Sequence, residues 1–330
     1  MKFIDNKGNH DPYINLAIEE YILNTFDTDK DSYLLFYING PSIIVGRNQN
    51  TIEEIDAGYV DKNGIKVVRR LSGGGAVYHD LGNLNYSFIT KDDGESFRNF
   101  KKFTQPVVDA LNSLGVKAEL QGRNDLLVEG RKISGNAQFS TQGRMYSHGT
   151  LMFDTDIGEV VNALKVKKDK IESKGIKSIR SRVANISEFL EEPMTIEEFR
   201  QYILEQIFGG KDKIEYVELT EDDWENIRKL SEKRYGNWDW NYGKSPKFNM
   251  SHSKRFPVGG IDVKLDVNKG KIEDAAIFGD FFGVGEVAEI EEALKGAPYS
   301  TEGIEQAIEG INIEKLLGGI TKEDFIDLIY

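Results

Sequence analysis

The most informative absence in this sequence is cysteine. None of the 330 residues is a cysteine, which excludes disulfide bridges, thiolate metal sites and any mechanism that runs through a cysteine thioester. Long hydrophobic runs are absent too: no stretch approaches the length that spans a bilayer, and the opening residues MKFIDNKGNHD lack the apolar core of a signal peptide. We therefore expect a cytoplasmic protein without a membrane partner.

Acidic side chains outnumber basic ones, 55 to 42, but one segment is basic. The formal net charge is −13 at pH 7, which argues against general nucleic-acid binding. That segment is Lys165–Arg182, with eight basic and two acidic residues. A basic segment on an acidic protein usually binds an anionic ligand. The length and the 39% hydrophobic content suit one large domain, residues 1–246, and one small domain, residues 247–330. A monomer is the default expectation.

Three consecutive glycines mark the central motif, RRLSGGGAVYHD at residues 69–80. The apolar runs at 65–68 and 76–78 predict strands on both sides of it. Glycines cost about 0.5–1 kcal/mol each within regular structure, so keeping three favours a binding loop over a plain turn. Arginines beside unscreened amides suit a phosphate or a carboxylate. Because the loop has neither GxGxxG spacing nor a P-loop ending, the residues alone predict only an anion or nucleotide site.

The remaining pattern alternates between β-rich runs and capped helices. We expect a hairpin of residues 33–38 and 42–45, and the capping box Thr51–Glu54 predicts a short helix to about Val60. A hairpin turning at 268–270, followed by two or three acidic helices, makes the tail a small α+β domain. The other expected strands are 84–89, 116–120, 125–128, 132–139 and 145–153, and the other expected helices begin near residues 11, 97, 195 and 220.

Lys132 lies in the second conspicuous motif, GRKISGNA at residues 130–137. Alternation along a strand would send its side chain to the face opposite Ile133. The sequence does not decide which of the two faces is covered. A lone lysine is normally solvated, so the residue types alone favour a surface position.

Five motifs in this order, RRLSGGGAVYHDLGN, GRNDLL, GRKISGNAQ, HGTLMFD and KSIRSRVANI, resemble the lipoate–protein ligase family. The match runs from about Tyr13 to the Ser245-Pro246 segment, and the tail resembles the small C-terminal accessory domain of the family. The resemblance implies an α+β fold, with a mixed or antiparallel sheet and flanking helices of the biotin/lipoate ligase type. Biotin ligases carry a different, arginine-studded glycine loop, so SGGGAVYHD points to the lipoate branch.

The resemblance also implies the reaction. Such enzymes join the carboxylate of lipoate to ATP, release pyrophosphate, hold lipoyl-adenylate and pass the acyl group to a lysine of a lipoyl domain. It implies ATP with magnesium and lipoate as substrates, no tightly bound prosthetic group, and a glycine-cleavage H protein or a 2-oxoacid dehydrogenase acyltransferase subunit as acceptor. Fixed cations and backbone amides suit the charge that builds on the phosphorus oxygens.

The resemblance implies specific roles for the residues of this chain that match the family motifs. Lys132 matches the central lysine, which bridges the acyl carbonyl and the phosphate. Asp125, beside Asn124, matches the position of a magnesium or adenylate contact, although a local Asx cap remains an alternative. The implied ATP or adenylate contacts are Arg70, Gly75, Ala76, Val77, Tyr78, Lys132, Ser178 and Arg180. The implied lipoate contacts are Ser72, Gly73, Gly74, His79 and Lys132.

Histidine could remove the proton from the acceptor lysine, but the adenylate is already activated. We therefore interpret His79 as a pocket wall beside the dithiolane end and His148 as a hydrogen-bonded strand residue. His10 and His252 are expected at the surface.

Two competing functions are weighed against the ligase. An octanoyl or lipoyl transferase of the same fold works through a cysteine thioester, which this chain cannot form. A non-catalytic paralogue that binds acyl-adenylate is disfavoured by the intact Arg70, glycines and Lys132. Exchange of label between pyrophosphate and ATP would separate a ligase from a binding module. The sequence does not decide the acceptor or the preference for lipoate over octanoate.

The basic segment Lys165–Arg182 predicts a lid. Lys174-Gly175 interrupts any helix, and Ser178–Asn185 matches the adenylate-side loop of the family. Closure over bound adenylate would exclude water from the anhydride. Trypsin should therefore cut at Lys174, Lys177 or Arg180 much faster in the free protein than with a non-hydrolysable lipoyl-adenylate analogue. Equal rates, with binding of the analogue confirmed, would refute the lid.

Overall fold

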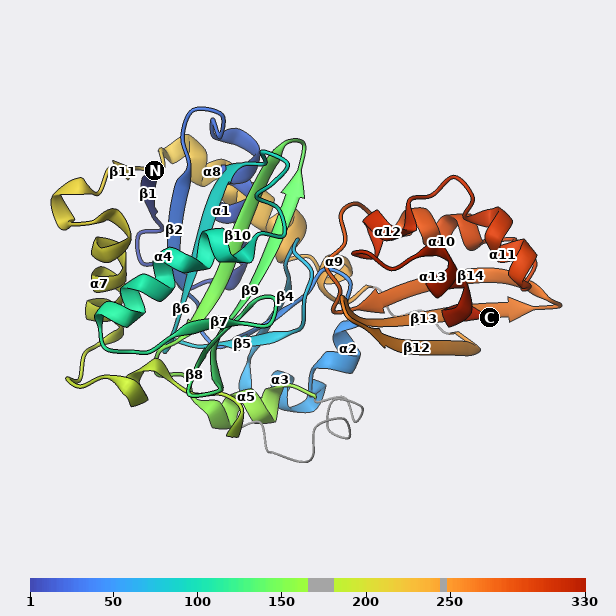
Figure 1. Cartoon of the computed structure of the whole chain (residues 1–330), viewed down its shortest axis with the longest axis horizontal. Helices are drawn as coiled ribbons and strands as arrows, with labels where there is room; N and C mark the ends of the chain where they lie inside the picture. Colours follow the sequence, from blue (N-terminus) through green and yellow to red (C-terminus); the bar gives the residue numbers. More distant parts are fainter. Residues whose placement is uncertain (166–180, 244–247) are drawn as a thin grey trace. The chain divides into compact units, whose positions relative to one another are not determined.

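The computed structural model of the chain describes residues 1–165, 181–243 and 248–330 (Figure 1). Contacts between residues divide it into two units. The first comprises Met1–Ile44, Glu54–Arg69 and Val77–Asn241, and the second comprises Val45–Glu53, Arg70–Ala76 and Tyr242–Tyr330. The C-terminal region thus forms one unit with two short segments from the N-terminal half. The expected domain boundary after Pro246 lies outside the described residues.

A mixed, mainly antiparallel sheet is the centre of the first unit. Its strand order is β11-β1-β2-β6-β10-β9-β8-β7. β1 pairs in parallel with β2 and β11, whereas the pairs from β2 to β7 along the sheet are antiparallel. The bounds are β1 Lys2–Asp5, β2 Tyr33–Ile38, β6 Asn83–Lys91, β7 Glu119–Gln121, β8 Asp125–Val128, β9 Arg131–Thr141, β10 Arg144–Met152 and β11 Tyr216–Val217. The predicted α+β class with a mixed or antiparallel sheet is confirmed.

Helices cover both faces of this sheet (Figure 1). α4 (Phe100–Ser113) and α7 (Ile196–Phe208) share a core with Leu34 and Phe36 of β2. α1 (Pro12–Thr25), α8 (Glu221–Leu230) and the π-helix η4 (Ser231–Tyr235) pack together on the other face. Every residue of β2 is buried, as expected for a central strand covered on both sides.

Capping explains where the helices begin. Asp11 accepts a hydrogen bond from the N–H of Tyr13 at 2.9 Å, with Pro12 in the first turn. Thr195 and Glu198 form the predicted capping box of α7. The expected helix from Thr51 to about Val60 is instead two helices, because Asp56 caps a new start. The remaining bounds in this unit are α3 Ala57–Asn63, α5 Ile157–Ala163, η2 Ile186–Phe189 and η3 Lys211–Lys213, while α2 (Thr51–Glu54) and α9 (Trp238–Tyr242) lie where the chain passes from one unit to the other.

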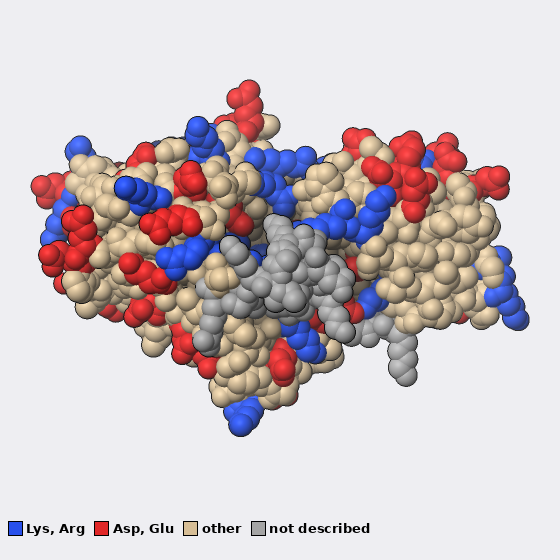
Figure 2. All heavy atoms as spheres, turned by 60° about the horizontal axis from the view of Figure 1, so that its bottom comes forward, with Lys and Arg blue, Asp and Glu red and all other residues tan. Residues whose placement is uncertain are grey.

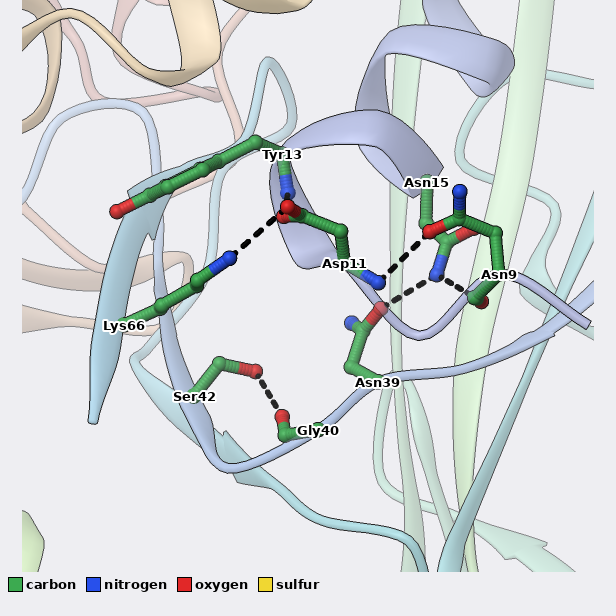
Figure 3. A network of polar contacts seen from close by, with 8 residues as sticks. All are labelled: Asn9, Asp11, Tyr13, Asn15, Asn39, Gly40, Ser42 and Lys66. Atoms are coloured by element: carbon green, nitrogen blue, oxygen red, sulfur yellow. Dashed lines mark hydrogen bonds and ion pairs between the residues drawn. The ribbon is translucent and has the colours of Figure 1, made fainter. Parts of the chain in front are cut away.

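A second sheet, of order β4-β3-β5, carries the strands on both sides of the glycine motif. β4 is Lys66–Arg69, β3 is Ser42–Val45 and β5 is Val77–His79. The predicted hairpin of residues 33–38 and 42–45 is wrong, although both strands exist, because β2 and β3 belong to different sheets. The reason is Asn39, whose buried amide bonds to Asn15 of α1 at 2.8 Å and to His79 of β5 at 3.0 Å. The connection is therefore held to α1 and does not close a two-stranded turn (Figure 3).

The second unit contains the predicted small α+β domain. β12 (Met250–Phe256), β13 (Gly259–Asn268) and β14 (Lys271–Gly279) form an antiparallel sheet. The turn at Lys269-Gly270 has φ angles of 50° and 75°, which confirms the predicted hairpin. The prediction missed β12. The described residues 248–330 hold four helices where two or three were expected: α10 Ala288–Leu294, α11 Thr301–Ala307, α12 Ile313–Leu316 and α13 Lys322–Ile329.

On the face drawn in Figure 2, the two units carry different patterns of charge. Figure 2 shows acidic side chains gathered at one edge of the C-terminal unit, whereas both signs are interspersed on the first unit. Within the described residues, no helix has the length and apolar character needed to cross a bilayer.

Phe199 of α7 provides a test of how this helix is held to the sheet. Its side chain is fully buried and stacks on Phe153 with the ring centroids 4.6 Å apart. Phe199→Ala should lower the free energy of unfolding by about 3–5 kcal/mol, through lost burial and a cavity. Val161→Ala, at a partly exposed position of α5, should change it by about 0.5 kcal/mol or less. Denaturant titration of both variants measures the difference, and similar midpoints would contradict this packing.

Candidate active site

A β-bulge sets the direction of Lys132. Leu126 of β8 pairs with Ser134, but Leu127 pairs with Lys132, so β9 contains one extra residue at this point. Ile133 is completely buried in the core, whereas 38% of the Lys132 side chain is exposed. Bulges commonly redirect side chains beside active sites. The structure therefore answers what the sequence left open: the core takes Ile133, and Lys132 points away from it.

The ammonium group of Lys132 meets a carboxylate on the neighbouring strand. Its Nζ lies 2.8 Å from Oδ1 of Asp125, the first residue of β8. A side chain at Gly135 would place its Cβ 3.0 Å from this Nζ, so the glycine leaves room for the lysine. Both partners are more than a third exposed, and such pairs contribute only about 0–1 kcal/mol to stability. An incoming anion can therefore compete with Asp125 for the ammonium group.

The backbone of Lys132 is fixed by the chain that follows the basic segment. Its N–H donates to the carbonyl of Arg182 at 2.8 Å, and its carbonyl accepts from the N–H of Ala184 at 3.0 Å. Val183 thus forms a parallel bridge with Lys132. The end of the fifth sequence motif lies beside the lysine. Ser178, Arg180 and most of the predicted lid, residues 166–180, lie outside the described residues.

The polar residues that follow Lys132 on β9 form a buried hydrogen-bond network that the sequence reasoning missed. Asn124 and Asn136 exchange side-chain amide to backbone carbonyl bonds, at 2.6 and 3.1 Å. The hydroxyl of Tyr86 donates to Oδ1 of Asn136, and burial raises the pKa of this tyrosine, which keeps it a neutral donor. Ser134, Asn136 and Gln138 are all buried. The alternation of these three polar residues within an otherwise β-rich run was the feature of the sequence that could have indicated this network.

Arg70 holds the glycine loop in shape. Its guanidinium donates to Oγ of Ser72 at 3.0 Å, and to the carbonyls of Gly73 and Gly75 at 2.6 and 2.9 Å. The side chain is buried. The loop therefore folds around a fixed positive charge, and its carbonyl oxygens point to that charge.

Packing explains two of the three consecutive glycines. A Cβ at Gly73 would clash with the carbonyl oxygen of Phe281, and Gly74 has φ +92° with Phe282 against it. Gly75 differs, because no described atom lies within 4 Å of the position where its Cβ would be. The fold of this unit requires Gly73 and Gly74 but gives no reason for Gly75.

The neighbouring arginine, Arg69, has a structural role. Its backbone N–H donates to Oδ1 of Asn241 at 2.8 Å, and its Nε donates to the carbonyl of Trp240 at 2.9 Å. The indole Nε1 of Trp240 donates back to the carbonyl of Arg69 at 2.8 Å. Trp240 and Asn241 therefore hold the end of β4 in place by hydrogen bonds, and the glycine loop begins directly after it.

The histidines divide into two buried and two outer residues. His79 of β5 is 3% exposed, with Nδ1 3.0 Å from the amide nitrogen of Asn39. His148 of β10 is buried, and its Nδ1 lies 2.9 Å from a carboxylate oxygen of Glu19, which confirms it as a hydrogen-bonded strand residue. His10 is exposed and His252 is half-buried. Beside His79, burial raises the pKa of Tyr78.

No preformed metal cage exists in the part of the chain that the structure describes. No group of three or more His, Asp or Glu side chains is placed to hold an ion there. Asp125 offers one carboxylate, which is paired with Lys132. Mg²⁺ that is bound mainly through nucleotide phosphates and water needs only one or two protein carboxylates, so a single acid fits that mode of binding.

Fold and site together define a class. In the first unit Lys132 pairs with an exposed carboxylate, and in the second unit a glycine loop is built around the buried Arg70. Cations and backbone amides are the groups that stabilise the charge of acyl-phosphate chemistry. Two family descriptions match the chain: the lipoyl protein ligase A/B catalytic domain over residues 11–208, and the bacterial lipoate protein ligase C-terminus over residues 245–329. The chain belongs to the lipoate–protein ligase family, as its motifs predicted.

Curated relatives agree over the full length. The lipoate–protein ligase LplJ of Bacillus subtilis is 67% identical over 332 aligned positions, which cover 100% of both chains. Lipoate–protein ligase 1 of Staphylococcus aureus is 56% identical over 329 positions, again covering 100% of both. The predicted enzyme class, a ligase acting through ATP, is confirmed, and the transferase alternative is not favoured.

Solved structures show the same fold. LipL1 of P. falciparum, in complex with lipoate, is 25% identical with a TM-score of 0.77, covering 99% of this chain and 97% of that chain. A lipoate–protein ligase A bound with ATP is 30% identical with a TM-score of 0.63, covering 73% and 98%. A bipartite ligase from Thermoplasma acidophilum, from a study that includes its E2 lipoyl domain, is 31% identical with a TM-score of 0.64, covering 76% and 98%.

Gly75 allows a role in ligand binding to be tested separately from a role in folding. Gly75→Ala should leave the melting temperature unchanged, because the added methyl group meets open space. It should weaken ATP binding by about tenfold or more, because it obstructs the approach of a ligand to the backbone, a loss of ~1.4 kcal/mol. Calorimetric titration with ATP measures the affinity.

Two further variants serve as controls for Gly75→Ala. Gly73→Ala should lower stability, because its Cβ would clash with backbone, whereas Gly310→Ala also meets open space and should change neither stability nor affinity. Unchanged ATP affinity in a folded Gly75→Ala protein would remove Gly75 from the nucleotide site.

Proposed function

We propose that this protein activates lipoate with ATP to lipoyl-AMP, and then transfers the lipoyl group to a specific lysine of a lipoyl-domain acceptor protein. The observation that supports the catalytic part most directly is the setting of Lys132. Its backbone N–H and carbonyl are both hydrogen-bonded to residues 182–184, and its ammonium group pairs with the exposed carboxylate of Asp125.

In the first step a carboxylate oxygen of lipoate attacks the α-phosphorus of ATP, and the bond to pyrophosphate breaks. Negative charge builds on the phosphorus oxygens, and two anions must approach each other. Lys132 is proposed to leave Asp125 and bridge the acyl carbonyl and the phosphate, where a fixed cation lowers the barrier. We propose nucleotide contacts at Arg70, Gly75, Ala76, Val77, Tyr78, Lys132, Ser178 and Arg180.

Arg70 would act through the loop as well as through its charge. Its guanidinium already bonds to the carbonyls of Gly73 and Gly75, which fixes the loop before ligand arrives and reduces the ordering cost of binding. We propose lipoate contacts at Ser72, Gly73, Gly74, His79 and Lys132. Because a Cβ cannot be accommodated at Gly73, any contact there is made by backbone atoms.

Magnesium would assist the same step. Asp125 could provide one carboxylate once Lys132 turns to the substrate, with nucleotide phosphates and water completing the coordination. When bound, the ion supplies positive charge to the phosphate oxygens that leave as pyrophosphate.

In the second step the ε-amine of the acceptor lysine attacks the acyl carbonyl and AMP leaves. The solved relative from Thermoplasma acidophilum, studied with an E2 lipoyl domain, supports an acceptor of this kind. We propose that the acceptor is a glycine-cleavage H protein or a 2-oxoacid dehydrogenase acyltransferase subunit, and that the ligase acts as a monomer. In this proposal residues 1–246 carry both steps, and residues 247–330 form an accessory domain.

Lys132→Ala tests the role of the lysine in adenylation. The rate of lipoate-dependent exchange between pyrophosphate and ATP should fall by about two orders of magnitude or more, as when one group that stabilises transition-state charge is removed. Stability should change little, because the ion pair with Asp125 is exposed. Lys102→Ala is the matched control, since Lys102 pairs with Asp93 at 3.2 Å on the surface, and its exchange rate should stay within about twofold of the wild type.

Near-normal exchange by a folded Lys132→Ala protein would remove the lysine from catalysis. Absence of exchange in the wild type, with ATP, magnesium and lipoate all present and bound, would instead favour the non-catalytic paralogue.

A further inference from the structure

Four buried side chains form a hydrogen-bonded relay that ends at His79. Asn6 Nδ2 donates to Asn15 Oδ1 at 2.9 Å, and Asn15 Nδ2 donates to Asn39 Oδ1 at 2.8 Å. Asn39 Nδ2 then lies 3.0 Å from Nδ1 of His79. All four residues are at most 4% exposed, so water does not readily replace these bonds. Figure 3 shows the middle of the relay, where Asn15 bonds to both Asn9 and Asn39.

Backbone groups fix the direction of the relay. The N–H of Gly8 donates to Oδ1 of Asn6, so the other end of that amide must be its NH₂ group. This group also donates to the carbonyl of Asn9, as does Nδ2 of Asn15. A backbone N–H can only donate and a carbonyl can only accept. The turn at residues 6–9 therefore determines which end of each asparagine is the donor.

That direction continues to the last member. Because Asn15 uses its NH₂ group toward Asn39, the atom of Asn39 that meets it is the oxygen. The NH₂ group of Asn39 is then the atom facing His79. A donor at this place requires an acceptor on the imidazole, so Nδ1 must carry a lone pair and no hydrogen.

We propose that the turn at residues 6–9, acting through Asn15 and Asn39, holds His79 in the tautomer with its proton on Nε2. Asn39 is then a positioning residue. In this tautomer the lone pair of Nδ1 is used by Asn39, and Nε2 has a hydrogen in place of a lone pair. Neither nitrogen can accept a proton from the acceptor lysine. Given the proposed ligase function, His79 is a hydrogen-bond donor in the lipoate site and not the general base of transfer.

Nitrogen NMR of the full chain tests the tautomer directly. The sequence contains four histidines, so protein labelled with ¹⁵N-histidine gives few signals, and His79→Gln identifies the pair that belongs to His79. We expect a pyrrole-type shift at Nε2 and a pyridine-type shift at Nδ1. A proton on Nδ1 of His79 in the wild type at neutral pH would overturn the proposal, whatever the enzyme activity.

Asn39→Asp reverses the last bond with almost no change in shape. The carboxylate presents only acceptors, so the single proton of the neutral His79 ring should move from Nε2 to Nδ1; the Nδ1 shift should become pyrrole-type and the Nε2 shift pyridine-type. Asn85→Asp is the matched control: Asn85 is equally buried and donates to the carbonyl of Tyr37, outside the relay. It should leave the His79 signals as in the wild type. If Asn39→Asp folds and the tautomer does not change, the relay does not control it.

A kinetic readout connects the tautomer to lipoate. Asn39→Asp should raise the KM for lipoate by about tenfold, or ~1.4 kcal/mol, while the KM for ATP changes by less than about twofold. Equal increases in both KM values would indicate a general structural defect and contradict the positioning role. Failure of the wild type to turn over lipoate would count against the proposed function alone, because the NMR result does not depend on activity.

Discussion

The constraint on which this structure depends is that polar groups buried inside it must be hydrogen-bonded. Leaving one unsatisfied costs about 1–3 kcal/mol, a large part of the stability of a typical domain. Here the partners come from distant parts of the chain: Arg69 is satisfied by Trp240 and Asn241, and Asn39 by Asn15 and His79. Each such bond fastens a segment next to the proposed site, so satisfying the core also orders the groups that meet the ligand.

Arg69, Arg70 and Lys132 illustrate how cationic side chains differ in what holds their charge. The guanidinium of Arg69 bonds to a fixed segment, and that of Arg70 bonds to the loop in which it lies. The ammonium of Lys132 pairs with the carboxylate of Asp125, and both side chains are more than a third exposed. Weakly held charge can be redirected by an incoming anion. The contacts give Arg69 a structural role and Arg70 a role in the shape of its loop, and they support the proposal that Lys132 takes part in the chemistry.

Local signals in the sequence predicted local structure well. The strands at 33–38, 42–45 and 125–128 have the expected bounds, and Thr195 with Glu198 begins a helix as expected. These features depend on residues that are close in sequence, such as a capping box or a β-rich run. The five motifs likewise identify the family from the sequence alone.

Features that depend on pairing between distant segments could not be predicted. The false hairpin after β2 followed from reading the Asn39-Gly40-Pro41 turn alone, whereas Asn39 is committed to α1 and β5. The two-residue strand β11 exists only because β1 lies beside it. The direction of Lys132 depends on a bulge opposite β8, and bulges have no reliable signature in one strand. Distinguishing Gly73 from Gly75 required knowing where Phe281 lies.

The proposed tautomer of His79 bears on what the second step requires. A mixed anhydride with AMP as the leaving group is already activated, so attack by an amine needs little help beyond orientation and stabilisation of the carbonyl oxygen. A buried base would have to be neutral before the reaction and charged after it, which low-dielectric surroundings oppose. With Nδ1 accepting from Asn39 and Nε2 carrying the hydrogen, His79 stays neutral and the cost of charging a buried base does not arise. In our proposal this also leaves Lys132 to serve both steps, because the acyl carbonyl and the phosphate that it would bridge persist from adenylation into transfer.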